Sequence, residues 1–136
     1  MGMYTELVLK CQLKENLPVE VMDIIMFMFK GGNRGSPPAT LPDHEFFKCG
    51  RWMMIGASSS FYHIPWKVND LEENYLFSRS DLKNYGGEIE AFVDWLTPYI
   101  ETCGQRTCIG WSWYEDADEP YLLFTEPEHP LTAKYQ

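Results

Sequence analysis

A change of hydrophobic period near the start of the chain constrains the fold more than any other feature of the sequence. In residues 4–14, YTELVLKCQLK, apolar or small side chains alternate with mostly polar ones, which is the period of a strand with one face in water. Residues 18–29 then place apolar side chains at the i, i+3, i+4 and i+7 positions of a helix, with Pro18 in its first turn. The sequence therefore predicts a strand followed directly by an amphipathic helix.

Further strands are expected in the middle and at the end of the chain. Residues 51–64, RWMMIGASSSFYHI, favour two strands around a small-residue segment, and residues 74–82 favour another. Residues 107–115 and 120–126 favour two aromatic strands joined across the acidic turn DADE.

Helical patterns return in two places. Residues 86–100, GGEIEAFVDWLTPYI, have helical spacing, which predicts a helix near residues 87–101, and Pro98 should bend or end that helix. Residues 43–47, DHEFF, predict a short helical turn capped by Asp43. The resulting order is β-α-β-β-β-α-β-β, so we expect an α+β fold in which two helices pack on one face of an antiparallel or mixed sheet.

Length and composition favour a single domain over residues 1–136. The chain is 45% hydrophobic and 15% aromatic, which is enough apolar surface for a core without metal or disulfide bonds. Residues 31–43 are rich in glycine and proline and predict a surface loop inside that domain. The residues expected in the core are Leu7, Leu9, Val21, Ile24, Ile25, Met28, Ile89, Phe92, Val93 and Leu96.

The charge balance argues against nucleic acid as a partner. Twenty acidic residues against eleven basic ones give a formal net charge of −9, which repels nucleic acid and anionic membrane surfaces. No apolar run approaches about 20 residues, the length of a membrane span, and the N-terminus lacks the order of a secretory signal. We therefore expect a cytoplasmic protein without direct nucleic-acid or membrane contact.

The stretch 78–96, SRSDLKNYGGEIEAFVDWL, raises the question of a phosphate site, because a Gly-Gly pair precedes an amphipathic helix. A phosphate cradle needs free backbone donors and a local field that favours negative charge. Glu88 and Glu90 fall in the first turn and repel an anion, and neither a Walker pattern nor GxGxxG is present. The stretch favours a helix start, with an anion site at Arg79 or Lys83 as the alternative.

No constellation of catalytic or metal-binding residues is recognisable, so the sequence predicts neither a cofactor nor a metal. His44, Cys49 and His63 could supply three metal ligands, but their spacing matches no structural zinc class. An unrecognised enzyme site at these three residues is one alternative function. Carboxylates such as Asp81 and Glu88 could form an acid/base pair, but the abundance of carboxylates makes that signal unspecific.

Aromatic residues in the middle of the chain suggest a small-molecule pocket as another alternative function. The pocket would be lined by Trp52, Tyr62, Trp66, Tyr75 and Phe77, with Arg79 available for an anionic group. Ring faces and a guanidinium suit a nucleotide or a signalling molecule.

The end of the chain combines acidic and aromatic side chains. Residues 115–128 contain six carboxylates and neither Lys nor Arg. The residues expected to contact a partner are Trp111, Trp113, Tyr114, Glu115, Asp116, Asp118 and Glu119. An acidic rim around aromatic anchors suits a basic protein surface, because charges steer the encounter and buried aromatic side chains supply affinity. The alternative is a hairpin with a solvated acidic turn.

Three segments carry a resemblance to a group of small proteins: residues 41–52, LPDHEFFKCGRW, residues 78–100, and residues 110–124, GWSWYEDADEPYLLF. They are similar to segments of proteins, without an assigned activity, that are encoded in bacterial genomes and often by their phages. The resemblance covers most of the chain, and residues 56–70 depart from it. It implies a phage setting, and with the acidic charge it favours a non-catalytic accessory factor that binds a host protein, for example in antiviral defence.

Overall fold

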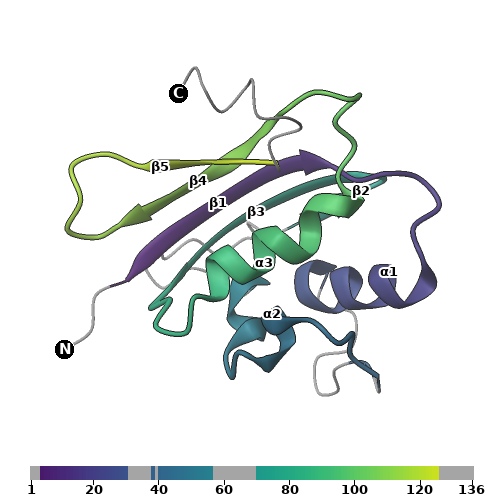
Figure 1. The fold of residues 1–136 in the computed structure, drawn as a ribbon, viewed down its shortest axis with the longest axis horizontal. Coiled ribbons are helices and arrows are strands. Elements are labelled where there is room, and N and C mark those ends of the chain that lie inside the picture. The colour runs from purple at the N-terminus through teal and green to yellow at the C-terminus, as the bar shows by residue number, and fades with distance from the viewer. Residues whose placement is uncertain (1–3, 31–37, 39, 57–69, 126–136) are drawn as a thin grey trace.

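The described part of the chain forms one antiparallel sheet with helices on one face (Figure 1). A computed structural model describes residues 4–30, 38, 40–56 and 70–125. The strands in these residues are β1 (Thr5–Gln12), β2 (Asp70–Glu72), β3 (Tyr75–Leu82), β4 (Cys108–Tyr114) and β5 (Tyr121–Phe124). They lie in the order β2-β3-β1-β4-β5, and every neighbouring pair is antiparallel. This arrangement confirms the predicted α+β class.

The helical layer consists of short segments. They are α1 (Val19–Ile25), a π-helical turn (Met26–Lys30), α2 (Glu45–Lys48), a 3₁₀ turn (Trp52–Gly56), α3 (Glu88–Leu96) and a second 3₁₀ turn (Thr97–Tyr99). As predicted, Pro98 lies where the regular helix ends, in the 3₁₀ turn after α3. Within the described ranges, no helix is long and apolar enough to cross a bilayer.

Small residues on the strands that flank the central strand β1 allow close packing around it. Leu7 and Leu9 are fully buried under the helices, and their cross-strand neighbours on β3 are the buried Ser80 and Ser78. Small neighbours leave room for the 3₁₀ turn, and the Ser80 hydroxyl donates a hydrogen bond to the carbonyl oxygen of Ile55 at 2.8 Å. On the other side of β1, the β4 residue that pairs with Leu9 is Gly110. A larger residue does not fit at this position, because an added Cβ would collide with the β1 backbone.

The core lies between the sheet and the helices, and it has an aromatic centre. The Phe46 ring of α2 is 5.1 Å from the Phe92 ring of α3 and 6.0 Å from the ring of Trp52, measured between centroids. Nine of the ten residues that the sequence assigns to the core are buried, and the tenth, Val93, is partly buried against it. The periodicity of the two helices therefore identified the correct faces.

Three local predictions need correction or lie partly outside the structure. The start of segment 51–64 is a 3₁₀ turn and not a strand, because Trp52 and Ile55, three residues apart, both bury their side chains; residues 57–64 lie outside the described residues. The cap of α2 is His44 and not Asp43, since the His44 ring nitrogen accepts the Phe46 N–H. Most of the predicted loop 31–43 also lies outside the described residues.

Candidate functional site

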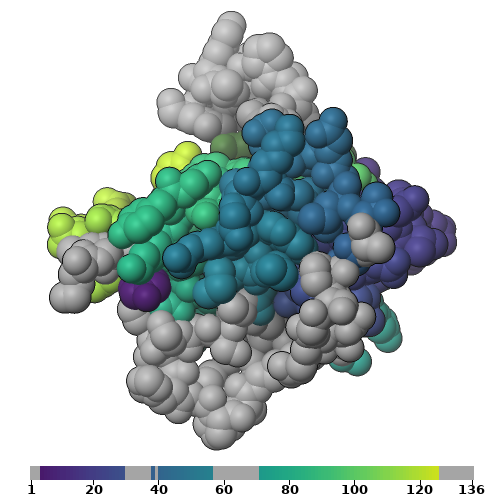
Figure 2. Space-filling model, turned by 90° about the horizontal axis from the view of Figure 1, so that it is seen from below, coloured from purple at the N-terminus to yellow at the C-terminus, as the bar shows by residue number. Residues whose placement is uncertain are grey.

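Three parts of the chain meet at one end of the sheet. Thr5 at the start of β1 pairs with Leu82 at the end of β3 and with Tyr114 at the end of β4. The turn that leads into α3 and the turn of the β4–β5 hairpin therefore leave the sheet at the same end, at the left of Figure 1. In Figure 2 the start of β1 (purple) lies beside the segment that leads into α3 (teal), with the hairpin (yellow-green) beyond it.

Hydrogen bonds hold the turn of the hairpin in a defined shape. The indole N–H of Trp113 donates to the Ala117 carbonyl oxygen at 3.0 Å, and the Ala117 N–H donates to the Tyr114 carbonyl oxygen at 3.0 Å. Glu115 is tied to Tyr4 twice: its Oε1 accepts the Tyr4 N–H at 2.9 Å, and its own N–H donates to the Tyr4 carbonyl oxygen at 2.9 Å. The carboxylates of this turn are thus presented from a fixed backbone.

The acidic hairpin, defined as residues 111–122, exposes both charge and large apolar side chains. Asp116, Asp118 and Glu119 are exposed to solvent. Tyr121 and Leu122 on β5, the edge strand, are 73% and 51% exposed. Large exposed apolar side chains beside polar groups are frequent at protein–protein contacts.

The hairpin carries apolar side chains on both faces of the sheet. Successive strand residues point to opposite faces, so Tyr114 and Tyr121 lie on the helix-bearing face, while Trp113 and Leu122 lie on the other. Trp113 and Tyr114 are exposed, and Trp111 is partly buried. The structure brings all seven sequence-predicted partner residues to this one projecting element.

Those residues of the predicted small-molecule pocket that the structure describes do not lie together. Trp52 is buried in the helical layer, whereas Tyr75 and Arg79 belong to the face of β3 that points away from the helices. Tyr62 and Trp66 lie outside the described residues. Since the sheet separates Trp52 from Tyr75 and Arg79, these three side chains cannot line one pocket.

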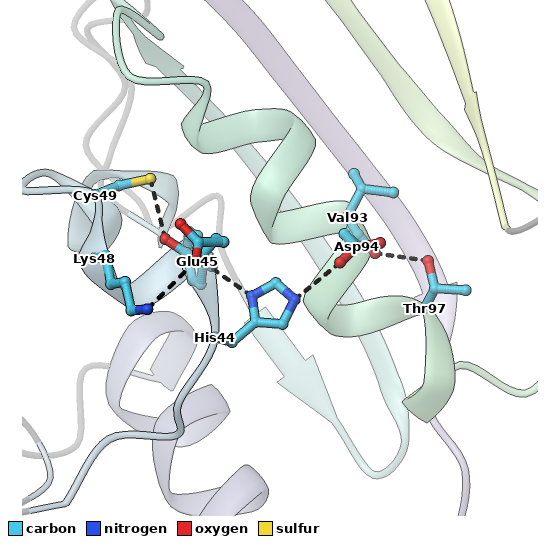
Figure 3. Close-up of polar contacts among 8 residues, drawn as sticks. His44, Glu45, Lys48, Cys49, Val93, Asp94 and Thr97 are labelled. Atoms are coloured by element: carbon cyan, nitrogen blue, oxygen red, sulfur yellow. Dashed lines mark hydrogen bonds and ion pairs between the residues drawn. The ribbon is translucent and has the colours of Figure 1, made fainter.

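His44 has a structural position between α2 and α3 (Figure 3). Its Nδ1 accepts the Phe46 N–H at 3.0 Å and its Nε2 is 2.9 Å from the Asp94 carboxylate oxygen, so both ring nitrogens have partners. His63 lies outside the described residues. In the part of the chain that the structure describes, no three His, Cys, Asp or Glu side chains gather into a potential metal site.

Cys49 is also held by local contacts and is not activated as a nucleophile. Its thiol donates to the carbonyl oxygens of Glu45 and Gly86, each at 3.6 Å. Partial burial, followed by the negative charges of Glu88 and Glu45, raises the pKa of the Cys49 thiol. A raised thiol pKa lowers the thiolate fraction that nucleophilic chemistry requires.

The backbone donors at the start of α3 are used by the chain itself. Asn84 Oδ1 accepts the Ile89 N–H at 2.8 Å, and Glu88 Oε1 accepts the Gly86 N–H at 3.1 Å. Gly87, with φ of 73°, supplies the left-handed residue that joins the turn to the helix. These contacts support a helix start rather than a phosphate cradle in the stretch 78–96.

The two cations of the alternative anion site also have partners. Arg79 Nε is 3.1 Å from Glu6 Oε2 on the neighbouring strand. Lys83 Nζ lies 5.5 Å from the ring centroid of Tyr4 and 5.8 Å from that of Tyr85, which are cation–π distances. Arg79 lies within β3, whereas Lys83 follows the last residue of that strand, and each is held by its own partners.

A cleft of about 290 Å³ opens at the junction of β3 and α3. Its lining includes Asp81 and Glu88, whose side chains are almost fully buried, together with Tyr4, Lys83 and Tyr85. Sequence reasoning missed this site, because its residues are brought together by the register of β1 against β3 and not by any local spacing. The only signal in the sequence was the presence of Asp81 and Glu88 among many other carboxylates.

Comparisons with protein-family models, with curated proteins and with solved structures gave no match. Two features at one end of the sheet, the acidic hairpin and the cleft, are therefore the candidates for the functional site.

Proposed function

We propose that this protein is a non-catalytic binding protein whose acidic hairpin docks on a basic surface of another protein. The observation that carries the proposal is the hairpin itself. Four carboxylates, those of Glu115, Asp116, Asp118 and Glu119, lie in one turn, next to the exposed side chains of the edge strand β5.

Each part of the hairpin has a separate physical role in this proposal. The carboxylates raise the rate of encounter with a basic surface, and this effect weakens with salt, because the screening length is about 10 Å at 0.1 M. Trp113, Tyr114 and Tyr121 supply apolar area that leaves water on docking, and such aromatic side chains are frequent energetic anchors. The hydrogen-bonded turn holds both in place before the partner arrives, which reduces the entropy lost on binding.

The resemblance to small proteins of bacteria and phages supplies the biological setting of the proposal. In that setting the protein acts as a phage-type accessory factor that binds and modulates a host protein, for example one used in antiviral defence. Host proteins that bind nucleic acid have basic grooves, and the carboxylates of the hairpin suit such a groove by charge.

The test compares two variants with the same net charge. The hairpin variant replaces the four carboxylates by amides (Glu115→Gln, Asp116→Asn, Asp118→Asn and Glu119→Gln), so that position 115 still has an oxygen to accept the Tyr4 N–H. The control variant carries the same number of charge removals at exposed carboxylates elsewhere, namely Glu15→Gln, Glu20→Gln, Asp23→Asn and Glu72→Gln.

Wild type and both variants are used as baits in lysate from a bacterial host at low and high salt. We expect a basic protein that wild type and the control variant retain at low salt, that high salt weakens, and that the hairpin variant loses. If the hairpin variant recovers the same proteins as wild type, the acidic turn is only solvated and the proposal is wrong. Equal loss in the two variants would show that net charge, and not the hairpin, attracts the partner.

A further inference from the structure

We infer that the partner that docks on the hairpin supplies an extended segment, which pairs with β5 as an additional antiparallel strand and carries basic residues directly after its paired residues. This inference rests on the proposed function, since it names the kind of segment that the same hairpin binds. It adds a backbone contact along the edge of the sheet to the charge contact at the turn.

The first argument is the open backbone of β5 at the edge of the sheet (Figure 1). The Thr125 N–H, one residue past the strand, donates to the Thr107 carbonyl oxygen on the β4 side at 2.9 Å. Backbone groups of successive strand residues point to opposite sides, so those of Leu123 also point toward β4, and those of Leu122 and Phe124 point away from it. Across the described residues, no further strand pairs with β5, and no backbone hydrogen bond outside the β4 ladder reaches Leu122 or Phe124. Their N–H and C=O groups therefore suit an added strand.

β5 also lacks the features that commonly protect the edge of a sheet. Natural edge strands oppose pairing through charged side chains, proline or bulges. At the other edge of the described sheet, β2 carries the exposed Glu72. The sequence of β5, YLLF, contains neither a charged residue nor proline, and the register shift of the β4–β5 pair lies in β4, between Cys108 and Gly110. Of these two edges, β5 is the one at which a strand can pair.

The side chains beside this edge favour an apolar strand. Leu122, 51% exposed, lies on the face of the sheet without helices, and Tyr121, 73% exposed, lies on the helix-bearing face. An added strand directs alternate side chains to the two faces, so it covers both of these residues. Pairs of aromatic and β-branched side chains on neighbouring strands stabilise a sheet. The partner segment is therefore expected to contain β-branched or aromatic residues where it pairs.

The second argument is the distribution of charge along β5. Asp118 and Glu119, both exposed, lie just before the first residue of the strand. Near the other end, the Arg106 guanidinium lies 3.9 Å from the centroid of the Phe124 ring. Antiparallel pairing, which joins every neighbouring pair of this sheet, places the C-terminal residues of an added strand beside the acidic turn. Charge therefore selects a segment whose basic residues follow its apolar part, because opposite charges on neighbouring strands attract and like charges repel.

A second copy of this chain fits these requirements less well. Each copy has a formal net charge of −9, so two copies repel. In an antiparallel pair of β5 strands, the residues that follow the paired segment are those after Phe124. That sequence, TEPEH, contains two carboxylates and neither lysine nor arginine. The occupant is therefore a different, basic segment.

The experiment is a titration of ¹⁵N-labelled protein with peptides, followed by NMR. The first peptide, acetyl-TVTVKK-amide, has its lysines after the strand-forming residues. The second, acetyl-KKTVTV-amide, has the same composition with the lysines before them. The amides of Leu122 and Phe124 report on the edge, and the Leu123 amide, which points toward β4, is the internal reference.

We expect the first peptide to shift the Leu122 and Phe124 amides more than the Leu123 amide, with saturation at roughly millimolar concentration. At low salt it should bind at least about fivefold more tightly than the second peptide, and high salt should reduce this difference. The hairpin variant should bind the two peptides alike, because it lacks the charges that distinguish them.

Methylated peptides test the backbone contact without any change to the protein. The first peptide is methylated on the N–H groups of both threonines or of both valines. Strand pairing uses the N–H groups of one of these two sets, because alternate residues point toward β5. One methylated peptide should therefore lose binding while the other retains it, and loss in both or in neither would overturn the strand pairing.

A protein variant tests the same contact from the other side. Leu122→Pro removes an N–H that points away from β4, at a position where edge strands tolerate proline. It should abolish peptide binding, whereas the control Leu122→Ala, which removes only the side chain, should weaken it by about threefold. Unchanged amide resonances in β1 and β3 verify that both variants are folded.

The outcomes separate this inference from the proposed function. No shift with the first peptide, or tighter binding of the second, would overturn the inference and leave hairpin-dependent capture of a partner unaffected. Shifts of the edge amides with the concentration of the protein alone would show a second copy at this edge and would also overturn it. The inference further requires that Leu122→Pro weakens capture of the same partner more than Leu122→Ala does. Failure of the proposed function is seen separately, as capture that does not depend on the hairpin.

Discussion

Replacement of Phe92 by alanine tests the packing on which the helical layer depends. The Phe92 side chain is 0% exposed, and its ring centroid lies 5.1 Å from that of Phe46 in α2 and 6.0 Å from that of Phe29 in the π-helical turn. One side chain on α3 thus contacts two other helical segments. Because all three rest on the same sheet, they cannot easily collapse into the space that truncation leaves.

The expected loss follows from that geometry. Truncation of a buried phenylalanine to alanine reduces the free energy of unfolding by about 3–5 kcal/mol. The loss lies in the upper half of this range where the surrounding side chains cannot move into the cavity. Each lost aromatic pair accounts for about 0.5–1.5 kcal/mol of this. Since small domains have a total stability of about 5–15 kcal/mol, this loss is a large fraction of the total.

The assay is equilibrium urea unfolding, with Val93→Ala as the control in the same helix. Val93 is only partly buried, so its truncation should reduce stability by about 1 kcal/mol. With a urea dependence of about 2 kcal/mol per molar, the Phe92 variant should unfold at a midpoint about 2 M lower than wild type. A loss below about 1.5 kcal/mol, or equal losses in the two variants, would refute the central position of Phe92.

Three further predictions concern other parts of the fold. Gly110→Ala should reduce the free energy of unfolding by at least about 3 kcal/mol, since φ is 141° and an added Cβ would meet the β1 backbone; an unchanged urea midpoint would contradict it. Asn84→Ala should reduce it by about 1 kcal/mol through loss of the acceptor at the start of α3. Asn84→Asp keeps that acceptor but should also be less stable than wild type, because the Asn84 amide donates to the Glu90 carboxylate and an aspartate would repel it. Burial raises the pKa of the Cys11 thiol to about 12, so a thiolate-specific reagent at pH 8 should label the exposed Cys103 and Cys108 well before it, and equal rates would refute that burial.

The elements that the sequence predicted correctly are those whose burial pattern is local. β1 was recognised from alternation over residues 4–14, and α3 from the spacing of Ile89, Phe92 and Leu96, all of which are fully buried. In both cases one face of a regular element contacts the core, so the pattern survives in the sequence. The acidic hairpin was recognised for the same reason, because its charged and aromatic residues are close in the chain.

The predictions that failed depended on tertiary contacts. The run WMMI in residues 52–55 is compatible with a strand or a helical turn, and packing of Trp52 in the aromatic centre decides for the turn. The cleft could not be found because Glu88 and Tyr4 are far apart in the sequence, and only the pairing of Thr5 with Leu82 brings them together. Strand register of this kind has no local sequence signal outside a hairpin.

The carboxylates of the hairpin have a second consequence, for the protein in the absence of its partner. β5 is an edge strand with the exposed side chains of Tyr121 and Leu122, and exposed apolar edges favour pairing with a second copy. Like charges in the adjoining turn, residues 115–119, oppose such pairing, so the feature that attracts a basic partner also disfavours self-association. The hairpin variant should therefore sediment faster than the control variant as concentration rises, although both have lost the same charge. If the two variants sediment alike at every concentration, the position of the carboxylates does not protect the edge and this argument fails.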